Sequence, residues 1–393
     1  MTRRTRLATL AASVVLVAAC GDGADEDSDA ATAGRDVTTV TVAQVESSPD
    51  ENVFSALDDP TNPDFPDPLV DLSAIRSGGP PPDGIPPIDE PRFLDASNVD
   101  FLADDEPVLA LTVGDETRAY PVQVLIWHEI VNDTLDGVPV TVSYCPLCNS
   151  AIAYDRRLGD RVLDFGTSGQ LFNSALVMYD RQTESLWSHF TGEAVVGHLT
   201  GEQLETFPVA TVSWSSFRDA HPDALVLSRD TGHDRSYGTN PYPGYDDVDT
   251  APFLFDGEVD GRLAAKERVI GIDRSAGAVA ITVSLLREER VVEVDDVVAW
   301  HLPGAASALD ASDVADGRDV GASSVFAPEV DGEQLTFREV DGGFEDLETG
   351  STWDILGRAV AGPLEGSQLT AIDHVDTFWF AWAAFQPGTE LVR

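Results

Sequence analysis

Residues 121–155 read PVQVLIWHEIVNDTLDGVPVTVSYCPLCNSAIAYD, and this stretch decides what kind of fold the chain can form. The strand-like runs IVNDTL and VPVTVSY flank Asp136-Gly137, a dipeptide typical of tight hairpins. Pro121 can start a short helix over VQVLIWHE, because the first helical residue needs no backbone donor. The second run ends at Cys145, so the predicted hairpin delivers the sequence CPLC into a loop.

The same alternation continues on both sides of this stretch. Upstream, VLALTVGDETRAYPV predicts a hairpin, and downstream AIAYDRR and RVLDF predict another around Gly159. The segment SWSSFRDA predicts a short helix that ends before Pro222. We therefore expect a mainly β (α+β) fold with short helices.

The second half of the chain repeats the first. DRQTESLWSHFTGEAVVGHLTGEQL, from Asp180, matches DLETGSTWDILGRAVAGPLEGSQL, from Asp346, and Trp187 aligns with Trp353. We predict two tandem, sequence-related β-rich lobes, the second of which has lost both cysteines. Residues present in both copies are best explained by packing, so residues confined to the first copy are the better functional candidates.

The amino terminus predicts export and anchoring. A basic start, a short apolar stretch and VAAC before Cys20 resemble a lipoprotein signal, although a plain signal peptide with an incidental cysteine is the alternative. We expect a lipidated protein on the outer face of the cell membrane. The predicted parts are a signal peptide (1–19), lipidated Cys20 with an acidic tether (20–50), a proline-rich extended segment (51–104), a first lobe (105–228), a turn-rich linker (229–265) and a degenerate second lobe (266–393).

The charge balance excludes one class of partner. The chain has 69 acidic and 24 basic residues, for a formal net charge of −45. Such a surface repels nucleic acid, and at ordinary ionic strength its self-repulsion destabilises the folded state. Concentrated salt shortens the screening length to about 3 Å at about 1 M. We therefore interpret the charge as adaptation to an extremely saline environment and expect no nucleic-acid partner.

Two segments resemble a known family. AYPVQVLIWHEIVNDTLDGVPVTVSYCPLCNSAIAYDR and FGTSGQLFNSALVMYDRQTESLWSHFTGEAVVG, with the later HP and PYPGYD segments, resemble the family catalogued as domain of unknown function 3179. The resemblance covers roughly residues 105–393. It implies that WHE and CPLC belong to the family signature, and it supplies no reaction. His189 stands where glutamine is expected in relatives, which makes it a weak ligand candidate.

The cysteine pair admits three interpretations. Cys145 and Cys148, with His128, have the ligand types of a copper or zinc site. The second interpretation is thiol–disulfide exchange, although the surrounding hairpins do not resemble a thioredoxin βαβ unit. The third is a structural disulfide in a non-catalytic protein that holds a small ligand with the tyrosines of residues 233–246. Whether the protein is an enzyme stays open at this point.

Further side chains are candidates for positions around the ligands. His128 and Glu129 could act as an acid–base pair, but Asn132 breaks the zinc-protease pattern HExxH. The dipeptides Asp155-Arg156 and Asp180-Arg181 predict ion pairs beside CPLC, or arginines that face an anion. Met178 is either a soft fourth ligand or a core residue. The residues expected around the site are Glu129, Asn132, Asp155, Arg156 and Met178.

Overall fold

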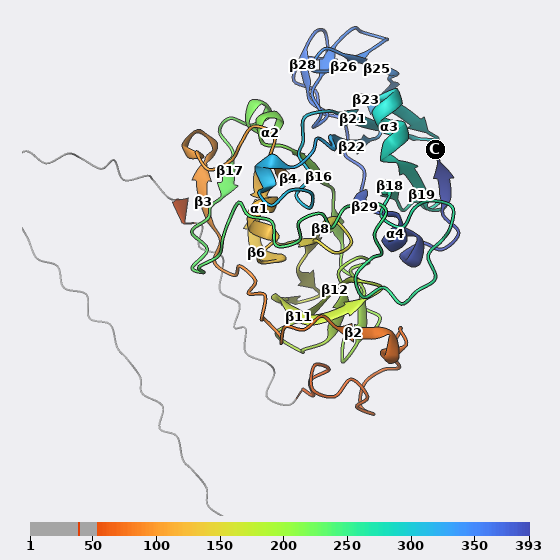
Figure 1. Ribbon diagram of the computed structural model, residues 1–393. Coiled ribbons are helices and arrows are strands. Elements are labelled where there is room, and N and C mark those ends of the chain that lie inside the picture. Colours follow the sequence, from red (N-terminus) through yellow and green to blue (C-terminus); the bar gives the residue numbers. More distant parts are fainter. Residues whose placement is uncertain (1–37, 40–52) are drawn as a thin grey trace, which may run out of the picture. The chain divides into compact units, whose positions relative to one another are not determined.

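The computed structural model describes residues 38–39 and 53–393 of the chain (Figure 1). The predicted signal peptide, Cys20 and nearly all of the acidic tether lie outside these residues. Strands dominate the described part and its helices are short, which confirms the predicted mainly β fold. Within the described ranges, no helix has the length and hydrophobicity needed to cross a membrane.

The quoted stretch folds into consecutive antiparallel hairpins, as predicted. Strands β6 (Ile130–Leu135) and β7 (Val138–Cys145) pair around Asp136 and Gly137, and both turn residues have positive φ. That backbone matches the right-handed twist of the flanking strands. Strand β8 (Ser150–Asp155) pairs with β7 and places Ser150 opposite Cys145. Upstream, β4 (Pro107–Val113) pairs with β5 (Glu116–Pro121).

The helix that follows Pro121 is shorter than predicted. Helix α1 covers only Val122–Leu125, and WHE lies beyond it in a turn. The reason is that Glu129 adopts a left-handed conformation, with φ of 59°, and β6 begins at the next residue. A residue in that conformation cannot continue a right-handed helix.

The first half is completed by small antiparallel strands and one helix. The predicted helix before Pro222 is present as α2. These elements are β9 (Arg157–Leu158), β10 (Arg161–Val162), β11 (Phe165–Phe172), β12 (Ala175–Asp180), β13 (Leu186–Ser188), β14 (Ala194–Val196), β15 (Thr206–Phe207), β16 (Val209–Ser213), α2 (Trp214–Ala220) and β17 (Leu225–Leu227).

The second half has nearly the same series of elements. They are β18 (Arg268–Ile272), β19 (Val279–Thr282), α3 (Val283–Glu289), β20 (Val291–Val294), β21 (Val297–Leu302), η3 (Val314–Asp316), β22 (Ala322–Phe326), β23 (Glu329–Val330), β24 (Glu333–Gln334), β25 (Phe337–Val340), β26 (Gly343–Asp346), β27 (Thr352–Trp353), β28 (Ala359–Ala361), β29 (Val375–Phe378), α4 (Trp379–Phe385) and β30 (Glu390–Val392).

Strand pairing recurs between the halves as well. Strand β4 pairs with β5 and β16, and β17 joins β5 in parallel; β18 pairs with β19 and β29, and β30 joins β19 in parallel. The four-stranded order β11 to β14 is repeated by β25 to β28. In both copies the tryptophan indole N–H donates to an aspartate, Trp187 to Asp180 at 2.9 Å and Trp353 to Asp346 at 3.0 Å. The tryptophan–aspartate pair therefore has the same structural role in both halves.

The halves are joined edge to edge rather than kept apart. Strand β16 pairs with β22 through Thr211 and Ser323, which makes one nine-stranded sheet from both halves. In return, the Phe378 backbone N–H of the second half donates to the Cys148 carbonyl at 3.0 Å. The cysteine turn therefore lies where the halves meet.

The proline-rich segment is extended, but it also takes part in the sheets. Strand β2 (Ile75–Ser77) pairs with β11, and β3 (Arg92–Asp95) lies between β17 and the short β1 (Thr38–Thr39). Two single turns, η1 (Leu72–Ala74) and η2 (Ala96–Asn98), interrupt it. Phe93 is fully buried, and the Phe65 ring packs edge-on against His198 at 4.9 Å. Both aromatic residues thus fix the segment.

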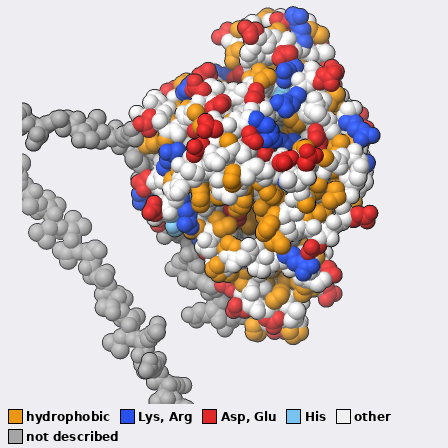
Figure 2. All heavy atoms as spheres, viewed as in Figure 1, with side chains coloured by type: hydrophobic (Ala, Val, Ile, Leu, Met, Phe, Trp, Pro, Cys, Tyr) orange, Lys and Arg blue, Asp and Glu red, His pale blue; other side chains and the backbone are white. Residues whose placement is uncertain are grey.

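Acidic side chains are spread over the surface. On the face shown in Figure 2, Asp and Glu are distributed among basic and apolar side chains rather than collected in one patch. This pattern agrees with a general solvation role for the charge and does not single out a cation site.

Candidate functional site

The CPLC sequence forms the turn between β7 and β8. Cys145 ends one strand, Ser150 begins the next, and Asn149 takes a positive φ of 51° to close the turn. Both cysteines are free thiols, and only 2% of Cys145 and none of Cys148 is exposed. The turn therefore holds two sulfur atoms inside the protein.

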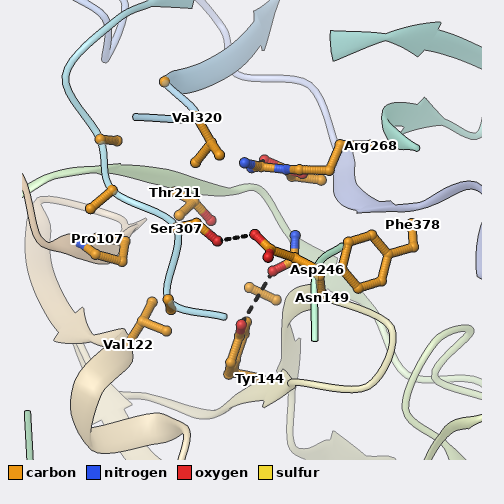
Figure 3. Close-up of a pocket in the computed structure, with 16 residues that line it drawn as sticks. Pro107, Val122, Tyr144, Asn149, Thr211, Asp246, Arg268, Ser307, Val320 and Phe378 are labelled. Carbon is orange, nitrogen blue, oxygen red and sulfur yellow. Dashed lines mark hydrogen bonds and ion pairs between the residues drawn. The ribbon is translucent and has the colours of Figure 1, made fainter. Parts of the chain in front are cut away.

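A buried polar cluster anchors the opposite side of this hairpin (Figure 3). The Tyr144 hydroxyl donates to Asn149 Oδ1 at 3.2 Å, and nearby the Ser307 hydroxyl donates to Asp246. The space between them is about 30 Å³, which is room for about one water molecule. This side of the hairpin serves to fix the turn and is too small to admit a substrate.

The Cys145 sulfur is surrounded by hydrogen-bond donors. Burial raises the pKa of Cys145, but the Cys148 thiol and the backbone N–H groups of Cys148, Leu176 and Leu147 donate to its sulfur. Together these donors hold the pKa of Cys145 below its ordinary value. A thiolate is the reactive form of cysteine, and Cys145 is the more readily ionised of the two sulfurs.

The pKa of Cys148 is shifted in the opposite direction. Burial raises its pKa well above the ordinary value, and the hydrogen bond to Cys145 and the charge of Cys145 raise it further. Its Sγ lies 3.0 Å from Ser150 Oγ, which in turn lies 2.8 Å from His189 Nε2. Of the two thiols, Cys145 is therefore the one that ionises first.

The hydrogen bonds fix the tautomer of His189. The Ser143 hydroxyl donates to the Ile152 carbonyl at 3.1 Å, so the imidazole must donate to Ser143 from Nδ1, at 2.9 Å. Nε2 is then the acceptor for the Ser150 hydroxyl, so the single hydrogen of the Cys148 thiol goes either to Ser150 Oγ or to the Cys145 sulfur at any one time. Burial lowers the pKa of His189 to about 3, so the ring is neutral and orients Ser150 toward Cys148.

Glu129 lies close to Cys145 in space, because its carbonyl accepts from the N–H of Tyr144, the residue before Cys145, at 2.8 Å. Its side chain is 8% exposed, and burial, followed by the negative charge of Cys145, raises its pKa to about 8. Among the described residues, no hydrogen bond is made to this carboxyl group. The left-handed backbone of Glu129, which a residue with a Cβ adopts at a cost of about 1 kcal/mol, directs the carboxyl group to this position. At neutral pH, Glu129 is therefore mostly a protonated acid.

Tyrosines from the linker cover the site. The Tyr245 hydroxyl donates to the Leu147 carbonyl at 3.0 Å and accepts from the Phe253 N–H at 3.1 Å. Lys266, the single lysine of the chain, lies over the Tyr245 ring at 4.4 Å and donates to the Tyr245 carbonyl. The charges of Glu129 and Cys145 contribute, after burial, to the raised pKa of Tyr242. The linker thus packs over the CPLC turn.

His128 is hydrogen-bonded to groups other than the two cysteines. Its Nδ1 lies 2.6 Å from the Pro86 carbonyl and its Nε2 lies 2.6 Å from the Tyr237 hydroxyl, so both ring nitrogens already have partners. Burial lowers its pKa to about 4. Across the described residues, no three His, Cys, Asp or Glu side chains are grouped so that they could hold a metal ion.

Asn132 and Met178, both predicted to lie around the cysteine site, have other surroundings. Asn132 Nδ2 donates to Asp89 and to the Phe165 carbonyl, both at 2.8 Å, and so ties β6 to β11. Met178 is fully buried in the same apolar core as the two cysteines. Its surroundings are those of a core residue.

Asp155, Arg156 and Arg181 each form an ion pair, and in each case the partner is not the neighbouring residue of the dipeptide. Arg156 pairs with Asp164 and donates to the carbonyls of Val140, Leu163 and Asp133, whereas Asp155 pairs with Arg157. Likewise, Arg181 pairs with Asp89 at 2.7 Å and with Asp83 at 3.2 Å, while Asp180 bonds to Trp187. Consecutive residues of a strand point to opposite faces, so neighbours in sequence seldom meet.

Sequence reasoning missed Ser150, considered His189 only as a weak ligand candidate, and gave Glu129 only a supporting place. The position of Ser150 two residues after Cys148 was visible. The contact of His189 with Ser150 was not, because 39 residues separate them.

One protein family matches this chain. The model of the family described as "Protein of unknown function (DUF3179)" aligns with residues 82–389. The chain belongs to the DUF3179 family. The match begins earlier than the start predicted at residue 105 and so includes part of the proline-rich segment. No curated protein and no solved structure matches the chain.

Proposed function

We propose that this DUF3179 protein is an extracytoplasmic, lipid-anchored dithiol protein that exchanges disulfides through Cys145 and Cys148. The observation that supports it is the unequal environment of the two sulfurs. Hydrogen-bond donors converge on Cys145, whereas Cys148 is bonded to the Ser150–His189 pair. Disulfide exchange uses such an asymmetry, with one thiolate to attack and a second thiol to resolve.

The proposed reaction has two steps. The Cys145 thiolate attacks one sulfur of a substrate disulfide; a mixed disulfide forms, and the departing thiolate takes the proton of Glu129. Cys148 then gives its proton to the Glu129 carboxylate and attacks the Cys145 sulfur. The Cys145–Cys148 disulfide forms and the second substrate sulfur leaves as a thiolate. The dithiol is thereby oxidised by two electrons and the substrate disulfide is reduced.

The electrostatics of Glu129 suit both steps. Burial, and then the charge of Cys145 while it is a thiolate, keep the neighbouring carboxyl group protonated and able to donate. When Cys145 enters the mixed disulfide, that charge is lost and the pKa of Glu129 falls. Glu129 thus donates a proton in the first step, and it ionises more readily before the second step.

Trapping with glutathione disulfide tests the proposal. In about 2 M KCl, reduced Cys148→Ser protein should accumulate a mixed disulfide on Cys145, because the resolving thiol is missing. Reduced Cys145→Ser protein should form much less adduct, and wild type should form the Cys145–Cys148 disulfide. Peptide mass spectrometry measures each product. Equal adduct on Cys148 in the Cys145→Ser variant would contradict the assigned order of attack.

A soft-metal site is the second candidate, because two sulfurs share one turn inside an apolar core. Copper(I) or zinc would then be held by Cys145 and Cys148, and His128 would have to leave its partners to join them. Elemental analysis of wild type, Cys145→Ser and Cys148→Ser tests this candidate. Equal metal content in all three proteins removes it.

The anchoring part of the proposal rests on Cys20 and the VAAC sequence before it. We expect mass spectrometry of the membrane-extracted protein to find a lipid-modified amino-terminal Cys20. An amino terminus that starts elsewhere without lipid would remove the anchor and leave the dithiol proposal intact.

A further inference from the structure

The internal repeat produces two grooves in equivalent positions. Equivalent backbone contacts define the correspondence: the Trp214 N–H donates to the Glu106 carbonyl at 2.8 Å, as the Trp379 N–H does to Glu267. A second matching pair is the Asp155 N–H to the Glu205 carbonyl and the Ala327 N–H to Thr370, both at 2.9 Å. By this correspondence, Gly271 matches Ala110 and Tyr154 matches Phe326.

We name each groove by its lining. The acidic groove, of about 640 Å³, includes Tyr154, Gly271, Glu205, Asp273 and Asp373. The neutral groove, of about 410 Å³, includes their counterparts Phe326 and Ala110. Val209 and His374 line both grooves and lie between them.

The neutral groove has lost the charges of its counterpart. Thr112 occupies the position of Asp273, and Pro208 occupies that of Asp373. Among the residues that line the neutral groove there is no Asp, Glu, Lys or Arg, although the chain has 69 acidic residues. A hollow without charge on so acidic a protein favours a neutral ligand, because a carboxylate at its wall would lose hydration on binding.

The histidines of the neutral groove do not restore a charge. Burial lowers the pKa of His221, and the charge of Arg358 lowers it further; burial also lowers the pKa of His374. Both rings are therefore neutral near pH 7. Apolar side chains supply most of the rest of the lining; they include Ala110, Val209, Ala210, Phe326, Leu356 and Leu369.

Polar groups at the groove can orient a ligand. The hydroxyls of Thr112 and Thr117 lie 2.8 Å apart, so one donates to the other and the second keeps a free hydrogen. Gln368 uses its Nε2 for the carbonyls of Leu356 and Leu369, which leaves Oε1 as an acceptor. An apolar cavity of this size with a donor and an acceptor has the features of a small-molecule site.

We propose that the neutral groove binds a neutral, largely apolar small molecule that carries a hydroxyl or carbonyl group. The acidic groove lies at the equivalent position of the repeat and has a charged lining. It therefore serves as a comparison site within the same protein. This inference is independent of the dithiol chemistry.

Calorimetric titration with 2-naphthol in about 2 M KCl tests the proposal. We expect 2-naphthol to bind at least about tenfold more tightly than 2-naphthoate, because the carboxylate must lose its hydration. Ala210→Phe fills the neutral groove and should weaken binding of 2-naphthol by about tenfold or more. Val375→Phe, at the matching position of the acidic groove, should leave the affinity unchanged.

A second variant covers the case in which Ala210→Phe does not fold. Thr112 is exposed on β4, so Thr112→Asp is compatible with the fold and restores the charge found in the acidic groove. It should weaken 2-naphthol binding by about threefold or more. No binding of 2-naphthol, equal affinity for 2-naphthoate, equal losses in Ala210→Phe and Val375→Phe, or an unchanged affinity in Thr112→Asp would each overturn the proposal.

Discussion

Replacing Glu129 by glutamine should change how the stability of the protein depends on pH. The folded pKa of Glu129 is about 8, above its ordinary value of 4.5, because the carboxyl group is buried beside Cys145. The folded state therefore holds a proton that the unfolded chain releases. The contribution of Glu129 to the free energy of unfolding is fully present below about pH 4.5. It is lost as the pH rises from about 4.5 to about 8.

The size of the effect on stability follows from the difference between the folded pKa of about 8 and the ordinary value of 4.5. Each unit of pKa corresponds to about 1.4 kcal/mol, so the ionisation of Glu129 costs the folded state up to about 5 kcal/mol. Glu129→Gln keeps the shape of the side chain and cannot ionise. Between pH 5 and pH 9, its free energy of unfolding relative to wild type should therefore rise by about 2 to 5 kcal/mol.

Urea unfolding in about 2 M KCl, followed by tryptophan fluorescence at a series of pH values, measures the difference. The matched control is Glu202→Gln, the same replacement at an exposed position. Cys145→Ser provides a second check, because removing the thiolate should shift the fall in stability to lower pH. Parallel pH profiles for wild type and Glu129→Gln would refute the assignment of Glu129 as a buried, protonated acid.

Three further outcomes are expected. Gly192→Ala should destabilise the fold by more than about 2 kcal/mol in urea unfolding, because φ is +69° and a Cβ would lie 2.4 Å from the Tyr154 ring; a smaller cost would contradict the close approach. Trp353→Phe should cost about 3 kcal/mol, since it removes a buried ring and the bond to Asp346, and an unchanged midpoint would show that the motif is dispensable. Lowering KCl from about 2 M to about 0.1 M should lower the thermal midpoint, and sorbitol at equal osmolarity should not replace the salt; insensitivity to KCl would contradict the salt adaptation.

The local elements were predictable because their causes are local. Period-two alternation and the Asp136-Gly137 turn specify the β6–β7 hairpin, and the capping position of Ser213 with Pro222 beyond specifies α2. The length of α1 was not predictable in the same way. Its end depends on the left-handed backbone of Glu129, which nothing in VQVLIWHE indicates.

By itself, the sequence determined the mainly β class, the repeated order of motifs and the CPLC pair, since alternation, turn residues and self-similarity are written along the chain. Tertiary structure alone decided what surrounds the sulfurs. It directed His128 to Pro86 and Tyr237, brought His189 to Ser150 and turned Glu129 toward Cys145. These contacts depend on how strands far apart in the chain are packed, and on which face each side chain leaves its strand, so spacing along the sequence cannot specify them.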